Sequence, residues 1–351
     1  MPDTLLYQEP YAAPAGHPEI KSGKVGALLV NLGTPEDTDY RSMRRYLSEF
    51  LSDRRVIELS PWIWQPILQG IILQTRPAKS ARAYRKIWRR EDDESPLRYF
   101  TRRQSDLLAE RLGAGGDLIV DWAMRYGEPS IASRMEALRE AGCDRIAVVA
   151  LYPQYAAATT ASVYDKTFDA LKTMRWQPAV RTAPSFHDHP AYIEALSESI
   201  QRHLDELAFK PEVLLMSYHG IPKRYFEEGD PYHCHCHKTT RLVRERLGFD
   251  EHFLRVTFQS RFGPTEWLRP YTDETLEALA QEGVTRVAVA APAFISDCVE
   301  TLEELAIEGA KTFLDAGGED FSLIPCLNDS EGAIDTLEAV LRRELAGWVS
   351  I

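Results

Sequence analysis

Residues 136–153, EALREAGCDRIAVVALYP, and residues 277–294, EALAQEGVTRVAVAAPAF, follow one pattern at a constant offset of 141 residues. Each stretch begins as the end of a helix, passes a glycine and enters an apolar run without alternation. Such a run is typical of a strand that is buried on both faces, as in a parallel sheet. The match therefore indicates that one helix–strand unit occurs twice in the chain.

Further apolar runs extend the repeat in both halves. The expected strands cover residues 25–33, 117–126, 145–153, 212–220, 253–260 and 286–294. Helical patterns lie between them, and RYG at 125–127 falls near RFG at 261–263 in the alignment of the halves. We therefore predict an α/β fold with two similar doubly wound, Rossmann-like parallel-sheet domains that face a central cleft.

The length of 351 residues suits two domains. We expect a flexible N-terminal arm over 1–24, a first α/β domain over 25–165 and a second over 180–345, joined between about 160 and 190. Ligands of open parallel sheets bind beyond the carboxyl ends of the strands, so the residues that follow each strand should line the cleft.

Composition and charge narrow the class of protein. A formal charge of −12 without a basic cluster argues against nucleic acid as a partner. No apolar signal-peptide core occurs in the first 24 residues, so we expect a cytoplasmic protein. Five cysteines, an odd number in a reducing compartment, do not suggest a disulfide framework.

The longest apolar stretch is WIWQPILQGIILQ, residues 62–74. Pro66, Gly70 and two glutamines interrupt it, and it is too short for a membrane span. It could lie on a membrane surface, line an apolar pocket or form a buried helix. The oligomeric state is left open.

Two polar side chains stand where the cleft is expected. His219 ends an otherwise apolar strand, and its partner in the repeat is Leu32, which can neither bind a metal nor take a proton. Glu300 and Glu304 lie four residues apart, on one face of the following helix. A structural histidine is the alternative for His219, and a capping box with Asp297 is the alternative for Glu300. An imidazole with a carboxylate could also hold Fe²⁺.

Several separated motifs carry a family resemblance. They are NLGTP (31–35), YPQY (152–155), SYHGIP (217–222), GDPY (229–232), QSRFGP (259–264) with Trp267, and SDCVETLEEL (296–305). In this order they resemble the ferrochelatases, from about residue 24 to about residue 345. The resemblance implies an enzyme that inserts Fe²⁺ into protoporphyrin IX, with release of two protons, at the last step of haem synthesis.

The resemblance also implies residue roles. His219 and Glu300 match the family's metal-binding and proton-removing pair, and Glu304 matches an acidic position on the path behind Glu300. The positions that match the porphyrin pocket are Leu32, Arg125, Tyr126, Tyr152 and Trp267, with the apolar segment 60–75 as a further wall. A surface ion pair for Arg125 and core packing for Trp267 are the alternatives. The resemblance implies Fe²⁺ and a porphyrin as substrates and no cofactor for the chemistry. It also allows a peripheral contact with a membrane.

The tract YHCHCHK, residues 232–238, holds two cysteines and three histidines. Its Cys-x-Cys spacing lacks a second pair and argues against a structural zinc ribbon. Three interpretations stay open: a [2Fe–2S] cluster, a metal-catching or redox-sensitive surface tract, or no metal role. For a cluster, Cys234 and Cys236 would need Cys298 and Cys326, which follow strands of the same half. Cys143 starts a strand elsewhere and should be core.

Two rival functions fit parts of the sequence. A chelatase for another tetrapyrrole, such as coproporphyrin III, would share the motifs, because the choice of macrocycle depends on the shape of the pocket. A two-lobed binding protein without chemistry would share the architecture, although such proteins are usually exported.

Overall fold

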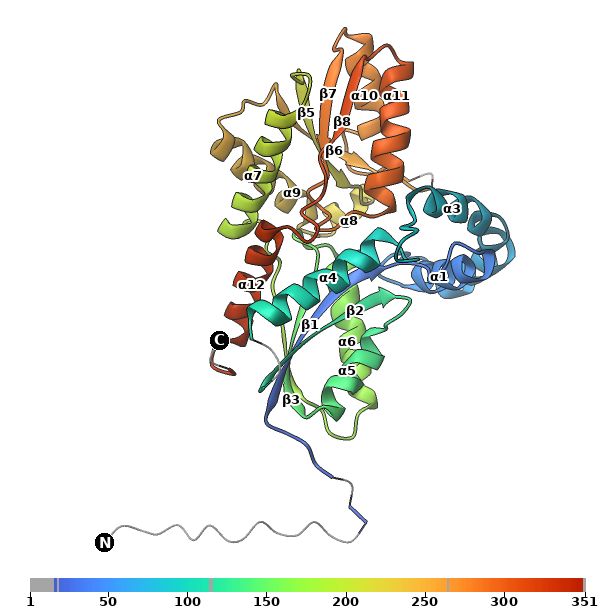
Figure 1. Cartoon of the computed structure of the whole chain (residues 1–351). Helices are drawn as coiled ribbons and strands as arrows, with labels where there is room; N and C mark the ends of the chain where they lie inside the picture. The colour runs from blue at the N-terminus through green and yellow to red at the C-terminus, as the bar shows by residue number, and fades with distance from the viewer. Residues whose placement is uncertain (1–15, 18, 114–115, 264, 350–351) are drawn as a thin grey trace.

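Two parallel sheets form the centres of two lobes in the computed structural model, which describes residues 16–349 except 18, 114–115 and 264 (Figure 1). The strand orders are β2-β1-β3-β4 and β6-β5-β7-β8, so both sheets have the same topology. The first sheet consists of β1 (Lys24–Gly33), β2 (Leu118–Tyr126), β3 (Cys143–Ala150) and β4 (Ala179–Thr182). The second consists of β5 (Val213–His219), β6 (Leu254–Gln259), β7 (Arg286–Ala290) and β8 (Asp320–Leu323). The predicted duplication and α/β fold are confirmed.

The outer strands differ from the prediction. All six expected strands are present, but β4 and β8 were not expected, because each is a short edge strand of four residues without a buried apolar run. Strand β4 carries the first sheet to residue 182, beyond the predicted boundary at 165. Most of the predicted arm, residues 1–15 and 18, lies outside the described residues.

Helices follow most strands and cover both sheets. In the first half they are α1 (Tyr40–Ser52), α2 (Pro61–Ile67), the π-helix η1 (Leu68–Ile72), α3 (Leu73–Ile87), α4 (Pro96–Arg111), α5 (Ile131–Glu140), η2 (Ala157–Ala161) and α6 (Ser162–Thr173). In the second half they are α7 (Pro190–Glu206), α8 (Lys223–Glu227), α9 (Tyr232–Leu247), α10 (Thr272–Gln281), η3 (Glu300–Gly309), α11 (Ala310–Asp315) and α12 (Glu331–Leu345).

Local sequence signals explain several of these boundaries. The Asp39 carboxylate accepts from the Arg41 and Ser42 amides and begins α1, and the Ser95 hydroxyl accepts from the Arg98 amide at the start of α4. Helix α9 ends where Gly248 takes a left-handed conformation with φ of 68°.

The strands pack on both faces, as their apolar runs predicted. In β1, Leu29 packs in a cluster with Leu108 of α4, whereas Leu28 packs in a cluster with Met135 of α5 on the other face. Cys143 is buried in the same cluster as Leu28, as expected for a core cysteine. This double coverage is why the runs lack polar alternation.

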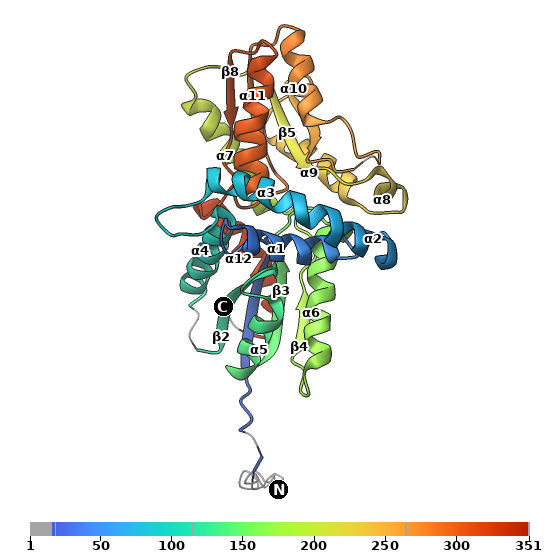
Figure 2. The same cartoon turned by 90° about the vertical axis from the view of Figure 1, so that its right-hand side faces the viewer.

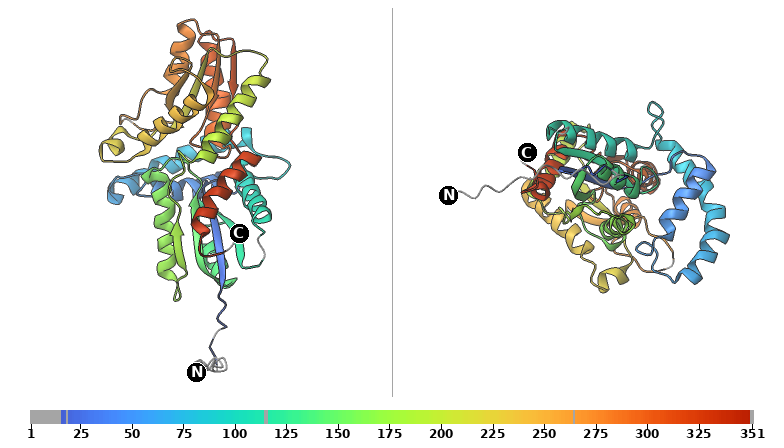
Figure 3. Two further views of the ribbon diagram at one scale, coloured as in Figure 1. Left: turned by 90° about the vertical axis from the view of Figure 1, so that its left-hand side faces the viewer. Right: turned by 90° about the horizontal axis from the view of Figure 1, so that it is seen from below.

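The two lobes share one core and contact each other along a broad seam. Helix α12 packs against α7 of the second half and against α4 and β3 of the first (Figure 3). Helices α1, α2 and α3 lie at the level of this seam in Figure 2, and Figure 1 shows α1 and α3 to one side of it. The carboxyl ends of β1 and β5 come together at this seam, where Leu32 and His219 line a common pocket. Among the described residues, no helix has the length and hydropathy needed to cross a bilayer.

Candidate active site

A cleft opens between the lobes at the carboxyl ends of the strands. Its larger chamber has a volume of about 740 Å³, and a smaller chamber of about 130 Å³ adjoins it. The residues that line both chambers are Phe50, Val56, His219, Pro222, Tyr225, Trp267 and Glu300. The predicted imidazole and carboxylate thus face the same space, one from the end of β5 and one from the start of η3.

The ring of His219 is held in one tautomer by the backbone. Its Nδ1 lies 2.6 Å from the carbonyl oxygen of Gly220, which can only accept, so Nδ1 carries the proton. The other nitrogen, Nε2, then has a free lone pair. Trp267 and Phe294 lie beside the ring at centroid distances of 6.5 and 6.4 Å. In its neutral form the side chain is therefore a base or ligand with apolar neighbours.

Glu300 is held at the first turn of η3. The Gln259 side-chain amide donates to the Glu300 carbonyl oxygen at 2.8 Å, and the Ser217 hydroxyl donates to Gln259 at 2.7 Å. Burial raises the pKa of Glu300 and the charge of Glu304 raises it further, whereas a hydrogen bond with Cys298 and, when His219 is protonated, the charge of that ring oppose the rise. The carboxylate is thus a stronger base than a solvated glutamate.

Glu304 lies one turn further along η3 and also faces the larger chamber. Burial raises its pKa, while a hydrogen bond donated by the Ser260 hydroxyl lowers it. A separate cavity of about 620 Å³ lies behind the pair and includes Glu303 and Glu308, both bonded to Lys86. Acidic groups therefore continue from the cleft toward the other side of η3.

The capping-box alternative for Glu300 does not describe the structure. The Asp297 carboxylate accepts from the Thr301 hydroxyl at 2.9 Å and from the Asn328 amide at 2.7 Å, and no side-chain cap is formed at the start of η3. The π-helical form of this element was not predicted. The Glu300 side chain is left to the cleft.

Of the positions expected to contact a porphyrin, Leu32 and Tyr152 line the smaller chamber and Trp267 lines both. The Tyr152 hydroxyl is buried without a hydrogen-bond partner among the described residues. A ligand or water that satisfies this hydroxyl would remove the cost of leaving it unpaired.

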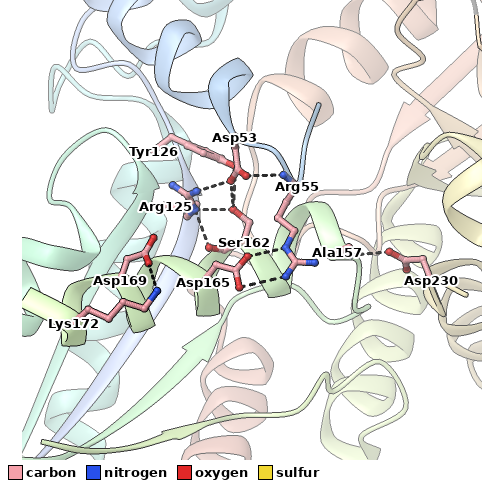
Figure 4. A network of polar contacts seen from close by, with 10 residues as sticks. All are labelled: Asp53, Arg55, Arg125, Tyr126, Ala157, Ser162, Asp165, Asp169, Lys172 and Asp230. Atoms are coloured by element: carbon pink, nitrogen blue, oxygen red, sulfur yellow. Dashed lines mark hydrogen bonds and ion pairs between the residues drawn. The ribbon is translucent and has the colours of Figure 1, made fainter. Parts of the chain in front are cut away.

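Arg125 and Tyr126 are placed differently, outside the lining of either chamber. The Arg125 guanidinium forms an ion pair with Asp53 at 2.5 Å, and the Tyr126 hydroxyl donates to the same carboxylate at 2.8 Å (Figure 4). Ser162 completes the network, and the charged side chains are almost fully buried. In this arrangement Arg125 anchors the end of α1, and the expected contact with a porphyrin stays a prediction.

Sequence reasoning did not find Arg76, which lines both the larger chamber and the cavity behind η3. Its guanidinium lies 4.6 Å from the ring centroid of Phe262. Among the described residues it makes no ion pair, although burial lowers its pKa and Glu304 is near enough to raise it. The loop that holds Val56, Ile57 and Leu59 was also missed as a cleft wall, because it follows a helix rather than a strand.

The four cysteines considered for a cluster do not converge. On α9, Cys234 is exposed and Cys236 is fully buried. Residues two apart in a helix are rotated by roughly 200° about the axis, so their side chains lie on nearly opposite faces. No group of three or more potential ligands is arranged to hold a metal within the described part of the chain. These residues do not fit a four-cysteine [2Fe–2S] site. Cys298 is buried beside Glu300, and burial raises its pKa.

Comparison with known proteins gives one consistent family. The family model for ferrochelatase matches residues 24–345. A ferrochelatase of Rhizobium etli is 62% identical over 336 residues, which cover 96% of this chain and 98% of that protein. A ferrochelatase of Agrobacterium fabrum is 59% identical over 338 residues, again 96% and 98% of the two chains.

Solved structures support the fold alone, at low identity. SirB from Bacillus subtilis with Fe3+ has a TM-score of 0.54 at 12% identity, covering 92% of this chain and 96% of that chain. The sirohydrochlorin chelatase SirB from Bacillus subtilis subspecies spizizenii in complex with cobalt has a TM-score of 0.51 at 12% identity and covers 92% and 97%.

Proposed function

The chain belongs to the ferrochelatase family, and from this premise we propose how its residues divide the work of the reaction. The enzyme inserts Fe²⁺ into protoporphyrin IX and forms protohaem, the last step of haem synthesis. Two pyrrole N–H protons leave as the cation enters, so the reaction needs a metal ligand and a base near the centre of the macrocycle. The observation that carries the proposal is that His219 and Glu300 face one cleft.

His219 acts as the first base, and it can bind the cation only before it takes the proton, because Nε2 has a single lone pair. Because Nδ1 is committed to Gly220, the Nε2 lone pair is free to accept a pyrrole proton or to bind the arriving cation. Glu300 accepts the second proton, for which its raised pKa is suitable, since a base works best when its pKa approaches the working pH.

Glu304 and the cavity behind η3 form a route for the entering Fe²⁺ or for the released protons. A cation that leaves water needs oxygen ligands on its way, and the released protons need acceptors on theirs. Glu303, Glu304 and Glu300 supply carboxylates from the surface side of η3 to the cleft. We assign this path to iron entry, proton exit or both.

The apolar walls bind the macrocycle. Leu32, Tyr152 and Trp267 line the chambers, and contacts with a flat ring remote from its nitrogens can hold it in a bent form that exposes the lone pairs. Arg76 is the cation we assign to a propionate, because it lines the cleft and has no ion-pair partner among the described residues. Arg125 could do so only by leaving Asp53.

The surface of α2 and η1 suits contact with a membrane. Trp62 is 90% exposed, and Ile63 and Ile71 are 61% and 60% exposed, whereas Trp64 points inward and lines the cleft. An exposed tryptophan among aliphatic side chains favours the interface of a bilayer. We propose a cytoplasmic enzyme whose apolar substrate reaches the cleft from a membrane surface along this edge.

Product analysis tests the assignment. Purified enzyme is given Fe²⁺ anaerobically with protoporphyrin IX or with coproporphyrin III, and the metallated product is measured. Formation of protohaem at the higher kcat/KM supports the proposal. A clear preference for coproporphyrin III would move the function to the alternative chelatase, and binding without metallation would favour a carrier.

A further inference from the structure

The tract at residues 232–238 forms the first turns of α9 and carries a feature that the cleft does not use. His233 and His237 lie four residues apart, so their side chains share one face of the helix. Their ring centroids are 4.3 Å apart. Neither residue lines a chamber of the cleft.

Neighbouring aromatic rings orient this pair. The His233 ring lies 5.0 Å from that of Phe226 and 6.0 Å from that of Phe258, with the latter nearly parallel at 17°. The His237 ring lies 6.4 Å from Phe258. These contacts hold the rings on one side, while His233 is half-buried and His237 is exposed to solvent.

The ring nitrogens of the pair are uncommitted. Within the described part of the chain, no hydrogen bond or ion pair engages His233 or His237. The third histidine of the tract differs, because Nδ1 of His235 accepts from the Tyr155 amide at 3.2 Å and its ring stacks on His187. The two imidazoles of the tract without hydrogen-bond partners among the described residues, those of His233 and His237, therefore lie next to each other on one face of α9.

This spacing suits a shared metal ion. Two imidazoles that bind one cation through bonds of about 2.0–2.1 Å have ring centres roughly 4.5–5 Å apart, and the observed 4.3 Å lies close to this range.

We propose that His233 and His237 form a two-imidazole surface site for a late first-row divalent cation such as Zn²⁺, with water in the remaining positions. Imidazole suits Zn²⁺, Cu²⁺ and Ni²⁺, and such a site binds Fe²⁺ more weakly in the usual order of affinities. With only two protein ligands the site is open and exchangeable, in contrast to a closed structural zinc site. It is distinct from the place where iron enters the porphyrin.

The test measures Zn²⁺ binding in competition with a chromophoric chelator. Full-length protein with the His219→Ala substitution is used, so that the cleft imidazole does not contribute. His237→Ala and His233→Ala are each compared with this parent, and His252→Ala, which removes a different exposed imidazole, is the matched control. Cys234→Ser tests whether the neighbouring thiol is the real ligand.

The proposal predicts that His237→Ala and His233→Ala each weaken Zn²⁺ binding at least tenfold, that the double variant is no weaker than either single one, and that His252→Ala and Cys234→Ser bind as the parent does. In the wild-type background, His237→Ala should metallate porphyrin at the normal rate, which shows an intact fold. Unchanged affinity in His237→Ala, or a loss confined to Cys234→Ser, would overturn the proposal.

Discussion

The Nδ1–H group of His219 donates to the carbonyl oxygen of Gly220 at 2.6 Å, and this single bond decides which ring nitrogen faces the substrate. A neutral imidazole has one donor and one acceptor, so the donor's commitment fixes Nε2 as the acceptor. The same strand brings the ring into the cleft, which Glu300 at the start of η3 also lines. Catalysis thus depends on backbone geometry as well as on residue type.

Glu300→Gln should lower iron insertion by about 10²- to 10⁴-fold and raise stability at neutral pH. The raised pKa means that the folded state holds a proton more tightly than the unfolded state, whose value is near 4.5. The contribution of Glu300 to the stability of the wild type is therefore fully present below that value, and it is lost as pH rises through the folded-state pKa. The variant does not show this decline, because glutamine does not titrate.

Thermal unfolding between pH 4 and pH 8 checks the prediction. The midpoint of Glu300→Gln should exceed that of the wild type by a few degrees at pH 8, and the difference should shrink toward pH 4. Glu308→Gln, on the exposed side of η3, is the control and should show little change. A difference that does not depend on pH would contradict the assignment of a buried charge to Glu300.

Arg76→Met should weaken porphyrin binding, whereas Arg125→Met should lower stability. Loss of Arg76 removes a cation from the cleft without leaving a partner unpaired, so KM for porphyrin should rise about tenfold or more while unfolding is unchanged. Loss of Arg125 leaves the buried Asp53 carboxylate unpaired and should cost about 3–5 kcal/mol of stability.

Steady-state kinetics and urea unfolding of both variants separate the two roles. If Arg125→Met keeps its stability and loses porphyrin affinity, the contact that the sequence predicted for Arg125 is right and the assignment to Arg76 is wrong.

Trp62→Ser with Ile63→Ser should weaken membrane contact. Both side chains are exposed, so the double substitution leaves the core intact and removes apolar area from the proposed contact surface. Flotation with vesicles of phosphatidylcholine and phosphatidylglycerol should recover less of this variant than of the wild type. Trp176→Ser, at another exposed tryptophan, should float as the wild type does. Equal flotation of all three proteins would argue against the proposed surface.

Cys234→Ser with Cys236→Ser tests the cluster prediction. Because one thiol is exposed and the other is fully buried, the described geometry predicts no [2Fe–2S] charge-transfer bands in anaerobically purified protein. The visible spectrum of the wild type should match that of the double variant. Bands that are present in the wild type and lost in the variant would show that these thiols ligate a cluster after all.

The sequence predicted the features that depend on burial. Apolar runs revealed six strands, and the offset between residues 136–153 and 277–294 revealed the duplication, because strands covered on both faces must be apolar. Strands β4 and β8 escaped notice since their four residues are only partly covered. The repeat also led to His219, which is polar where its counterpart Leu32 is not.

Other parts of the site depend on tertiary contacts that no local pattern encodes. The partner of Arg125 is Asp53, 72 residues away, so its commitment to an ion pair was not visible. Arg76 follows the apolar segment 60–75 and reaches the cleft because α3 packs against η3. The π-helical form of η3 likewise has no sequence pattern of its own.

The central claim is that one imidazole and one carboxylate, His219 and Glu300, which line the same cleft, carry out metal insertion. Its most direct test is His219→Ala, in which anaerobic protohaem formation and the porphyrin dissociation constant are measured on one preparation. The account predicts that insertion falls by about 10²- to 10⁴-fold while porphyrin affinity stays within a few-fold of the wild type. Retained turnover, or loss of porphyrin binding in a folded variant, would contradict it.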